Sequence, residues 1–98
     1  MLNDSMLKIS VIGSGNVAFH LMKAWRTTAD ITQVSPRTLE GLPEDSDIYI
    51  ISVSDNAIAD VASRLRHLSG IVAHTSGTTP MSVLTEAGVQ RPGVLYPL

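Results

Sequence analysis

The sequence predicts one α/β domain of three layers, in which a five-stranded parallel sheet of order 2-1-3-4-5 has helices on both faces. Stretches rich in β-branched residues alternate with stretches whose apolar residues recur at helical spacing, as in a doubly wound sheet. The length of 98 residues is that of one small domain. A hydrophobic content of 44% with 16% charged residues allows a buried core and excludes a disordered chain.

The first half of the chain predicts a strand, a helix and a second strand. Residues 7–12 contain several β-branched residues and lead directly into Gly13, as expected for a strand that ends in a turn. Residues 16 to about 27 have the apolar spacing of an amphipathic helix. Residues 31–34 predict a short strand, which ends where Pro36 would remove a hydrogen bond of the sheet.

The second half predicts two helices and three strands. Residues 47–53 are the most apolar run and are typical of a strand buried on both faces. Asp55 is expected to cap the following helix, and Gly70 to precede a fourth strand at 71–74. Thr79 is expected to cap a third helix that Gly88 ends, with Pro80 at its first position. Residues 94–96 predict the last strand.

The connection between the second and third predicted strands is short. Only eight residues, 39–46, separate Thr38 from Asp47. A further crossover helix and strand would need roughly 15 residues, because a crossover alone takes at least about 10–12. One strand–helix unit is therefore expected to be absent, which leaves five strands.

The first turn contains the clearest functional motif, G-x-G-x-x-A, placed between the first strand and the first helix. Gly13 permits the tight turn, Gly15 allows the backbone to approach a pyrophosphate, and Ala18 allows the helix to pack closely on the sheet. Amides at the helix start attract phosphate. The motif predicts dinucleotide binding by Gly13, Ser14, Gly15, Asn16, Val17 and Ala18. A tight turn that binds nothing is the alternative.

The end of the second strand favours NADP over NAD. A chain that binds NAD usually has an acid about 20 residues beyond the glycines, which holds the ribose 2′-hydroxyl. The nearest acid here, Asp30, lies at the opposite end of that strand. A guanidinium with neighbouring hydroxyls suits a 2′-phosphate, and this position holds Ser35, Pro36, Arg37 and Thr38. A solvated Arg37 without a ligand is the alternative.

Two further loops are expected at the carboxyl edge of the sheet, where ligands of such folds bind. The first, beside the nicotinamide half of the cofactor, contains Ser52, Val53 and Ser54. The second contains His74, Ser76 and Gly77. His74 and Ser76 are the candidates for catalysis or substrate polarisation, and a hydrogen-bonded structural histidine is the alternative for His74. The sequence identifies no other catalytic residue.

Composition and spacing exclude several other functions. The chain has no cysteine, and its three histidines lack metal-ligand spacing, so no metal site is expected. A net charge of −2 argues against nucleic acid as a partner. No stretch approaches the roughly 18 apolar residues of a membrane span, and the N-terminus lacks the basic flank of a signal peptide. We therefore expect a cytoplasmic protein without a membrane partner.

Five segments occur in a characteristic order: residues 11–18, 33–38, 47–55, 74–77 and 93–98. Together they resemble the N-terminal NADP-binding Rossmann domain of oxidoreductases in the 6-phosphogluconate dehydrogenase-like superfamily, which includes pyrroline-5-carboxylate reductase and the deazaflavin-dependent NADP oxidoreductases. The chain resembles above all bacterial proteins that join this domain to a C-terminal helical domain of unknown function. The resemblance implies that residues 13–18 and 35–38 hold NADP, and that residues 52–54 and 74–77 line the nicotinamide side.

The resemblance also implies a reaction and a longer parent protein. Relatives transfer hydride between nicotinamide and a small carbonyl or imine substrate, and they continue into a helical domain that completes the active site and often the dimer. Residues 1–98 are therefore expected to be a truncated cofactor domain, inactive in isolation, whose substrate the sequence does not identify. Apolar surface near residues 94–98 would favour association, so a homodimer is left open.

Three other functions stay open. The domain is alternatively a non-catalytic nucleotide-binding module that regulates a partner or senses redox state. A methyltransferase-like domain that binds S-adenosylmethionine would normally have an acid at the end of the second strand, so Ser35, Pro36 and Arg37 disfavour it. An interaction domain that has lost its ligand is the last alternative.

Overall fold

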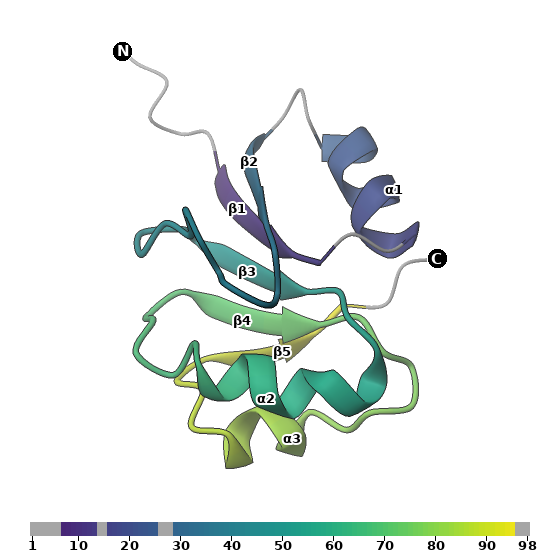
Figure 1. Ribbon diagram of the computed structural model, residues 1–98, viewed down its shortest axis with the longest axis vertical. Helices are drawn as coiled ribbons and strands as arrows, with labels where there is room; N and C mark the ends of the chain where they lie inside the picture. Colours follow the sequence, from purple (N-terminus) through teal and green to yellow (C-terminus); the bar gives the residue numbers. More distant parts are fainter. Residues whose placement is uncertain (1–6, 14–15, 26–28, 96–98) are drawn as a thin grey trace.

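Five parallel strands form one sheet in the order β2-β1-β3-β4-β5, which confirms the predicted fold class and strand order (Figure 1). The computed structural model describes residues 7–13, 16–25 and 29–95, without the side chains of residues 16–18, 21 and 25. The strands are β1 (Leu7–Ile12), β2 (Ala29–Val34), β3 (Ile48–Ile51), β4 (Ile71–His74) and β5 (Pro92–Val94). The pairing places the last residues of the five strands side by side: Val34, Ile12, Ile51, His74 and Val94. This row is the carboxyl edge, where ligands of such sheets bind.

Helices cover the two faces of the sheet unequally. α1 (Asn16–Trp25) packs over β1 and β2, and its Met22 contacts an apolar cluster that contains Val11 and Ile50. The short helix η1 (Asp55–Ala57), α2 (Ile58–Ser63) and α3 (Ser82–Glu86) cover the opposite face (Figure 1). Right-handed crossovers explain this, because the chain moves toward one sheet edge after β1 and toward the other after β3. None of the described helices is long and apolar enough to cross a membrane.

The larger apolar cluster lies under α2 and α3. Ile58, Val61 and Ala62 of α2 are buried, and so is Leu65, which follows the helix. They pack on the residues of β1, β3 and β4 that alternate with those of the other face, among them Ile12, Ile51 and Val72. Leu84 of α3 joins the same cluster.

Several strand boundaries differ from the prediction. β2 begins at Ala29, two residues before the predicted start, and pairs with β1 along its whole length. β3 ends at Ile51, because Ser52 and the residues after it turn toward η1 instead of continuing the ladder. β5 is Pro92–Val94 rather than 94–96, and residue 96 lies outside the described part of the chain.

Both predicted side-chain caps are wrong. Asp55 lies inside η1, whose N-cap is Ser54 without a side-chain cap bond. α3 begins at Ser82 with Met81 as its N-cap. The amide of Thr79 donates instead to Ser76 Oγ, at 3.1 Å, so Thr79 belongs to the preceding loop.

The predicted end of α3 at Gly88 is confirmed. Gly88 has a φ of +96°, a left-handed conformation that favours glycine after a helix. Its amide donates to the carbonyl of Thr85, and the amide of Val89 donates to that of Leu84, each at 3.1 Å. These two bonds satisfy carbonyls that the helix end would otherwise leave free.

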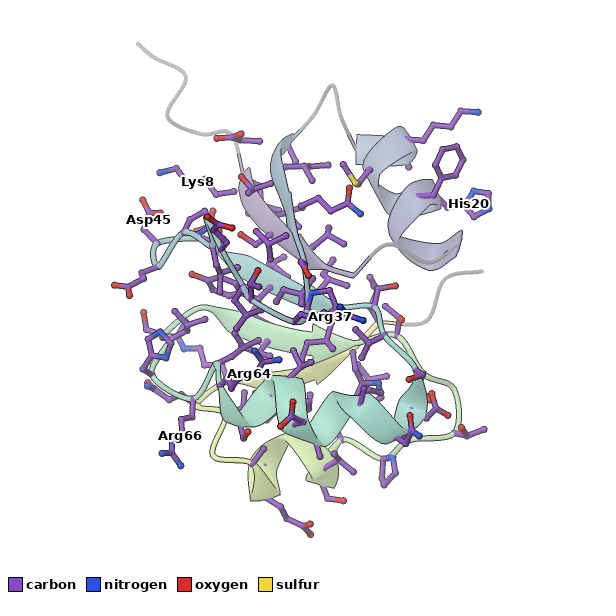
Figure 2. The ribbon with its side chains drawn as sticks, viewed as in Figure 1. Lys8, His20, Arg37, Asp45, Arg64 and Arg66 are labelled. Carbon is purple, nitrogen blue, oxygen red and sulfur yellow. The ribbon has the colours of Figure 1, made fainter. Side chains whose placement is uncertain are left out.

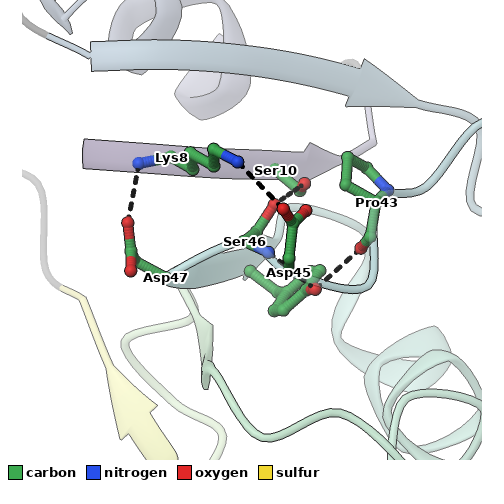
Figure 3. A network of polar contacts seen from close by, with 7 residues as sticks. Lys8, Ser10, Pro43, Asp45, Ser46 and Asp47 are labelled. Atoms are coloured by element: carbon green, nitrogen blue, oxygen red, sulfur yellow. Dashed lines mark hydrogen bonds and ion pairs between the residues drawn. The ribbon is translucent and has the colours of Figure 1, made fainter. Parts of the chain in front are cut away.

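Residues 35–47, all of them described, connect β2 to β3 without a helix or strand, as the short spacing predicted. Buried hydroxyls hold this connection at the amino edge of the sheet (Figure 3). The hydroxyl of Tyr49 donates to the carbonyl of Pro43 at 2.7 Å and accepts from the amide of Ser46 at 3.1 Å. Ser46 Oγ in turn lies 2.6 Å from Ser10 Oγ of β1.

An exposed ion pair holds the same connection from outside the sheet. Lys8 Nζ lies 2.9 Å from Asp45 Oδ2, and the amide of Lys8 donates to Asp47 Oδ2 at 2.9 Å (Figure 3). The contact raises the pKa of Lys8 and lowers that of Asp45, chiefly through their hydrogen bond. Both side chains are solvated, so the buried hydroxyls contribute more to holding the connection.

Gly70 packs against the end of the β2–β3 connection, so a substitution there tests how tightly this connection is held. A Cβ at Gly70 would lie 2.4 Å from the carbonyl oxygen of Ser46 and 3.1 Å from that of Asp47, so Gly70→Ala must displace backbone. We expect Gly70→Ala to lower the free energy of unfolding by about 2 kcal/mol or more. Gly93→Ala is the control, because its Cβ would make ordinary contacts of 3.6 Å with Ala73 and Ile71. Urea denaturation measures both, and equal stability of the two variants would contradict the expectation.

Candidate functional site

The candidate site begins where β1, β2 and β3 converge on Gly13. The amide of Gly13 donates to the carbonyl of Val34 at 3.1 Å, and the amide of Ser52 donates to that of Ile12 at 2.8 Å. Gln33 Nε2 donates to the carbonyl of Gly13 at 2.7 Å. The chain at Ile12 and Gly13 is therefore fixed by backbone and side-chain contacts to the ends of both neighbouring strands.

Only glycine fits at position 13. Its φ is +124°, a conformation that residues with a side chain rarely adopt. A Cβ there would lie 2.0 Å from the carbonyl oxygen of Ser52, which is backbone and has little freedom to move. The requirement for glycine at the first position of the motif thus has two independent causes.

The other motif residues are described only in part. Asn16, Val17 and Ala18 form the first turn of α1, as predicted, and only their backbone is described. Ser14 and Gly15 lie outside the described residues. Their contact with a cofactor therefore stays a prediction.

The predicted 2′-phosphate loop forms a compact turn after β2. Ser35 Oγ accepts a hydrogen bond from the amide of Arg37, and the carbonyl of Ser35 accepts one from the amide of Leu39 at 2.9 Å. Thr38 Oγ1 accepts from the amide of Glu40 at 3.2 Å. The side chain of Arg37 is exposed, so this turn presents a cation at the carboxyl edge.

Pro36 lines two hollows of the surface. The smaller, of about 350 Å³, is lined by Gly13, Gln33, Val34, Ser35 and Pro36. The larger, of about 610 Å³, is lined by Pro36, Arg37, Val53, Ser54, Ala57, Asp60, Val61 and Arg64. The structure thus brings Gly13 next to Ser35, and brings Arg37 next to the loop after β3.

Arg64, which follows α2, is a site residue that the sequence did not reveal. Its Nη1 donates to the carbonyl of Arg37 at 2.9 Å, and its Nη2 donates to the carbonyl of Pro36. Figure 2 shows both arginines in the space between the β2–β3 connection and α2. In the sequence, Asp60 and Arg64 have only the spacing of an exposed helical ion pair, which they also form at 3.6 Å.

Hydroxyl groups connect the loops after β3 and β4. Thr78 Oγ1 donates to Asp55 Oδ2 at 2.8 Å. Ser76 Oγ accepts from the amides of Thr78 and Thr79, and Ser54 Oγ donates to Asn56 Oδ1 at 2.9 Å. The hydroxyl of Thr78, followed by that of Ser76, holds the pKa of Asp55 below its usual value. Asp55 therefore joins two loops rather than capping a helix.

His74 is the last residue of β4. Its side chain is fully buried, and Nδ1 accepts a hydrogen bond from the amide of Ser76 at 3.1 Å. Because Nδ1 accepts, the ring proton is on Nε2, which has no hydrogen-bond partner among the described residues. Ser76 is half-buried, Gly77 is exposed and Ser52 is 8% exposed. The catalytic roles of His74 and Ser76 stay predictions.

Metal-ligand geometry is absent from the described part of the chain. No three His, Asp or Glu side chains within residues 7–13, 16–25 and 29–95 gather closely enough to hold a metal ion.

The fold has a counterpart among solved structures. No protein-family model and no curated protein matches the sequence. The structure is similar to the crystal structure of a putative NADPH-dependent oxidoreductase from Desulfitobacterium hafniense DCB-2, with a TM-score of 0.63 and 15% sequence identity. The match covers 97% of this chain and 35% of that one, so this chain spans about a third of its neighbour's length. At this identity the likeness supports the Rossmann-like fold and no more.

The link between Asp55 and Thr78 predicts a pH dependence of stability. Because the pKa of Asp55 is lowered in the folded state, the stabilisation is complete above its unfolded value and is lost as the pH falls through the folded value. We expect the midpoint of thermal unfolding to fall more steeply from about pH 5 to about pH 2 in the wild type than in Asp55→Asn. Thr78→Val should also make the midpoint fall less steeply with pH, and the double variant should have the same slope as Asp55→Asn alone. Equal slopes in all four proteins would contradict this link.

Proposed function

We propose that this chain is the NADP-binding domain of an oxidoreductase and that it binds the dinucleotide along the carboxyl edge of the sheet. The observation that carries the proposal is the position of Pro36, which lines both the hollow beside Gly13 and the hollow beside Arg37. Such an edge, with a glycine turn and a guanidinium after the second strand, has the chemistry that a phosphorylated dinucleotide requires. The solved neighbour, described as NADPH-dependent, has the same fold.

The residues present fit this cofactor. Because Gly13 has no Cβ, its backbone can lie against Ser52 at the end of β3, beside the smaller hollow. The larger hollow combines an apolar lining of Val53, Ala57 and Val61, suited to an adenine ring, with two arginines and one aspartate. That excess of positive charge suits a phosphate. We assign Ser35, Pro36, Arg37 and Thr38 to the 2′-phosphate and adenosine, and residues 13–18 to the pyrophosphate.

The nicotinamide side is assigned to the loops after β3 and β4. When bound, the nicotinamide would supply or accept the hydride exchanged with a small carbonyl or imine substrate. Ser52 would line one side of it, and Ser76 and Gly77 the other. Val53 and Ser54, which the sequence also predicts for this side, line the hollow beside Arg37. We assign His74 a positioning role, because its buried ring accepts the amide hydrogen of Ser76 and so orients that loop.

Substrate contacts are proposed to come from outside residues 1–98, because the chain spans about a third of a neighbour with the same fold. A non-catalytic, nucleotide-binding module is the second candidate. Two observations favour it: His74 is fully buried, and the carboxylate of Asp55 is engaged by Thr78. Such a module would bind the dinucleotide equally well, and would show no reductase activity in any longer form of the protein.

Calorimetric titration with NADPH and NADH tests the proposed cofactor. We expect the wild-type chain to bind NADPH more tightly than NADH, since only NADPH offers a phosphate to Arg37. Arg37→Ala should weaken NADPH binding roughly ten- to a hundredfold, the value of one charge-assisted contact, and leave NADH binding unchanged. Arg66→Ala removes the same charge from an exposed residue that points away from the Arg37 turn, and should change neither (Figure 2). A wild-type chain that binds neither nucleotide would refute the proposal.

A further inference from the structure

Arg64 makes the longest-range polar contact to the turn that carries Arg37. We infer that Arg64 is a positioning residue that determines the preference for NADP over NAD, by fixing the backbone of this turn. The inference rests on the proposed function and adds to it a second arginine, which comes from a different element and need not touch the cofactor.

Two consecutive carbonyls of the turn point at one guanidinium. Nη2 of Arg64 donates a hydrogen bond to the carbonyl of Pro36, and Nη1 donates one to the carbonyl of Arg37. A guanidinium is planar and its N–H groups have fixed directions, so bonds to neighbouring carbonyls fix both peptide planes. The second of these carbonyls belongs to Arg37 itself. Fixing it restricts the direction in which the Arg37 side chain leaves the backbone.

The rest of the turn is held mainly by local bonds. Ser35 supplies its hydroxyl to the amide of Arg37 and its carbonyl to the amide of Leu39, both within four residues. Such contacts fold the turn but do not orient it relative to the sheet and α2. The two bonds from Arg64 span 27 and 28 residues and supply this orientation.

The side chain of Arg64 is itself held in place. Its exposed fraction is 36%, and Asp60 Oδ2 lies 3.6 Å from Nη2. Its Nε is buried without a hydrogen-bond partner among the described residues, which leaves the two Nη atoms as the donors in use. A partly buried guanidinium in this arrangement holds the turn before any ligand arrives. The ordering cost of binding is then lower for a ligand that uses Arg37.

This arrangement separates selectivity from general affinity. NADH has no 2′-phosphate and gains nothing from an ordered Arg37, so loss of Arg64 should affect mainly NADPH. A purely electrostatic role of Arg64 makes a different prediction, because any cation at this position would then serve. Lysine keeps the charge but has a compact ammonium, which does not reproduce two fixed N–H directions.

Titration of Arg64→Ala and Arg64→Lys with NADPH and NADH tests the inference, with the wild type and Arg66→Ala measured beside them. The quantity compared is the ratio of the NADH to the NADPH dissociation constant. We expect this ratio to fall about five- to tenfold in both Arg64 variants, with NADH binding nearly unchanged. Arg66→Ala should keep the wild-type ratio. Circular dichroism shows that each variant is folded, and Arg64→Lys decides the question if Arg64→Ala does not fold.

The outcomes distinguish this inference from the proposed function. A wild-type chain that prefers NADPH, with the preference retained in Arg64→Lys and in a folded Arg64→Ala, would overturn the role of Arg64 alone. Retention in Arg64→Lys with loss in Arg64→Ala would assign Arg64 an electrostatic role and overturn positioning. Equal weakening of NADPH and NADH binding in the Arg64 variants would show that Arg64 has only a structural role and would overturn the inference. Failure of the wild type to bind either nucleotide would overturn the proposed function, and this inference with it.

Discussion

The approach of the backbone at Gly13 to the carbonyl of Ser52 is the constraint on which the carboxyl edge depends. The chain leaving β1 passes so close to the end of β3 that no side chain fits between them. At the same point the amide of Gly13 is bonded to the last residue of β2. Three strand ends are thus held in one place, and the loops that follow them start from fixed positions. The two hollows that Pro36 lines lie beside these starting points.

A second constraint follows from the short connection between β2 and β3. A longer fold would place a helix and a strand there, and their packing would hold the chain. Here individual polar side chains do so at both edges of the sheet. At the amino edge, Tyr49, Ser46 and Ser10 bury hydroxyls that bond to one another or to backbone, which offsets the cost of removing them from water. At the carboxyl edge, Arg64 bonds to two carbonyls of the same connection.

Local patterns in the sequence were sufficient for the fold and only partly for the site. Apolar spacing, the glycine turn and the short connection gave the strand order, because each of these acts within one element or between neighbouring ones. The predicted helix caps at Asp55 and Thr79 were wrong because other groups, distant in sequence or in the neighbouring loop, bond to these residues instead. The carboxylate of Asp55 bonds to Thr78, and the amide of Thr79 bonds to Ser76. The contact of Arg64 could not be predicted for a related reason, since no local pattern indicates which loop will lie over the end of a helix.

The segment from Asp55 to Arg64 contacts a different loop at each end. Asp55, its first residue, bonds to Thr78, and Arg64, its last, bonds to the carbonyls of Pro36 and Arg37. It therefore acts as a spacer of fixed length between the two halves of the candidate site. Each residue of an α-helix turns the chain by about 100° and advances it by about 1.5 Å. An insertion or deletion within this segment would aim one of its two end residues away from its loop. Exposed positions such as Ala59 are free to change identity, whereas the number of residues between the two ends is not free to change.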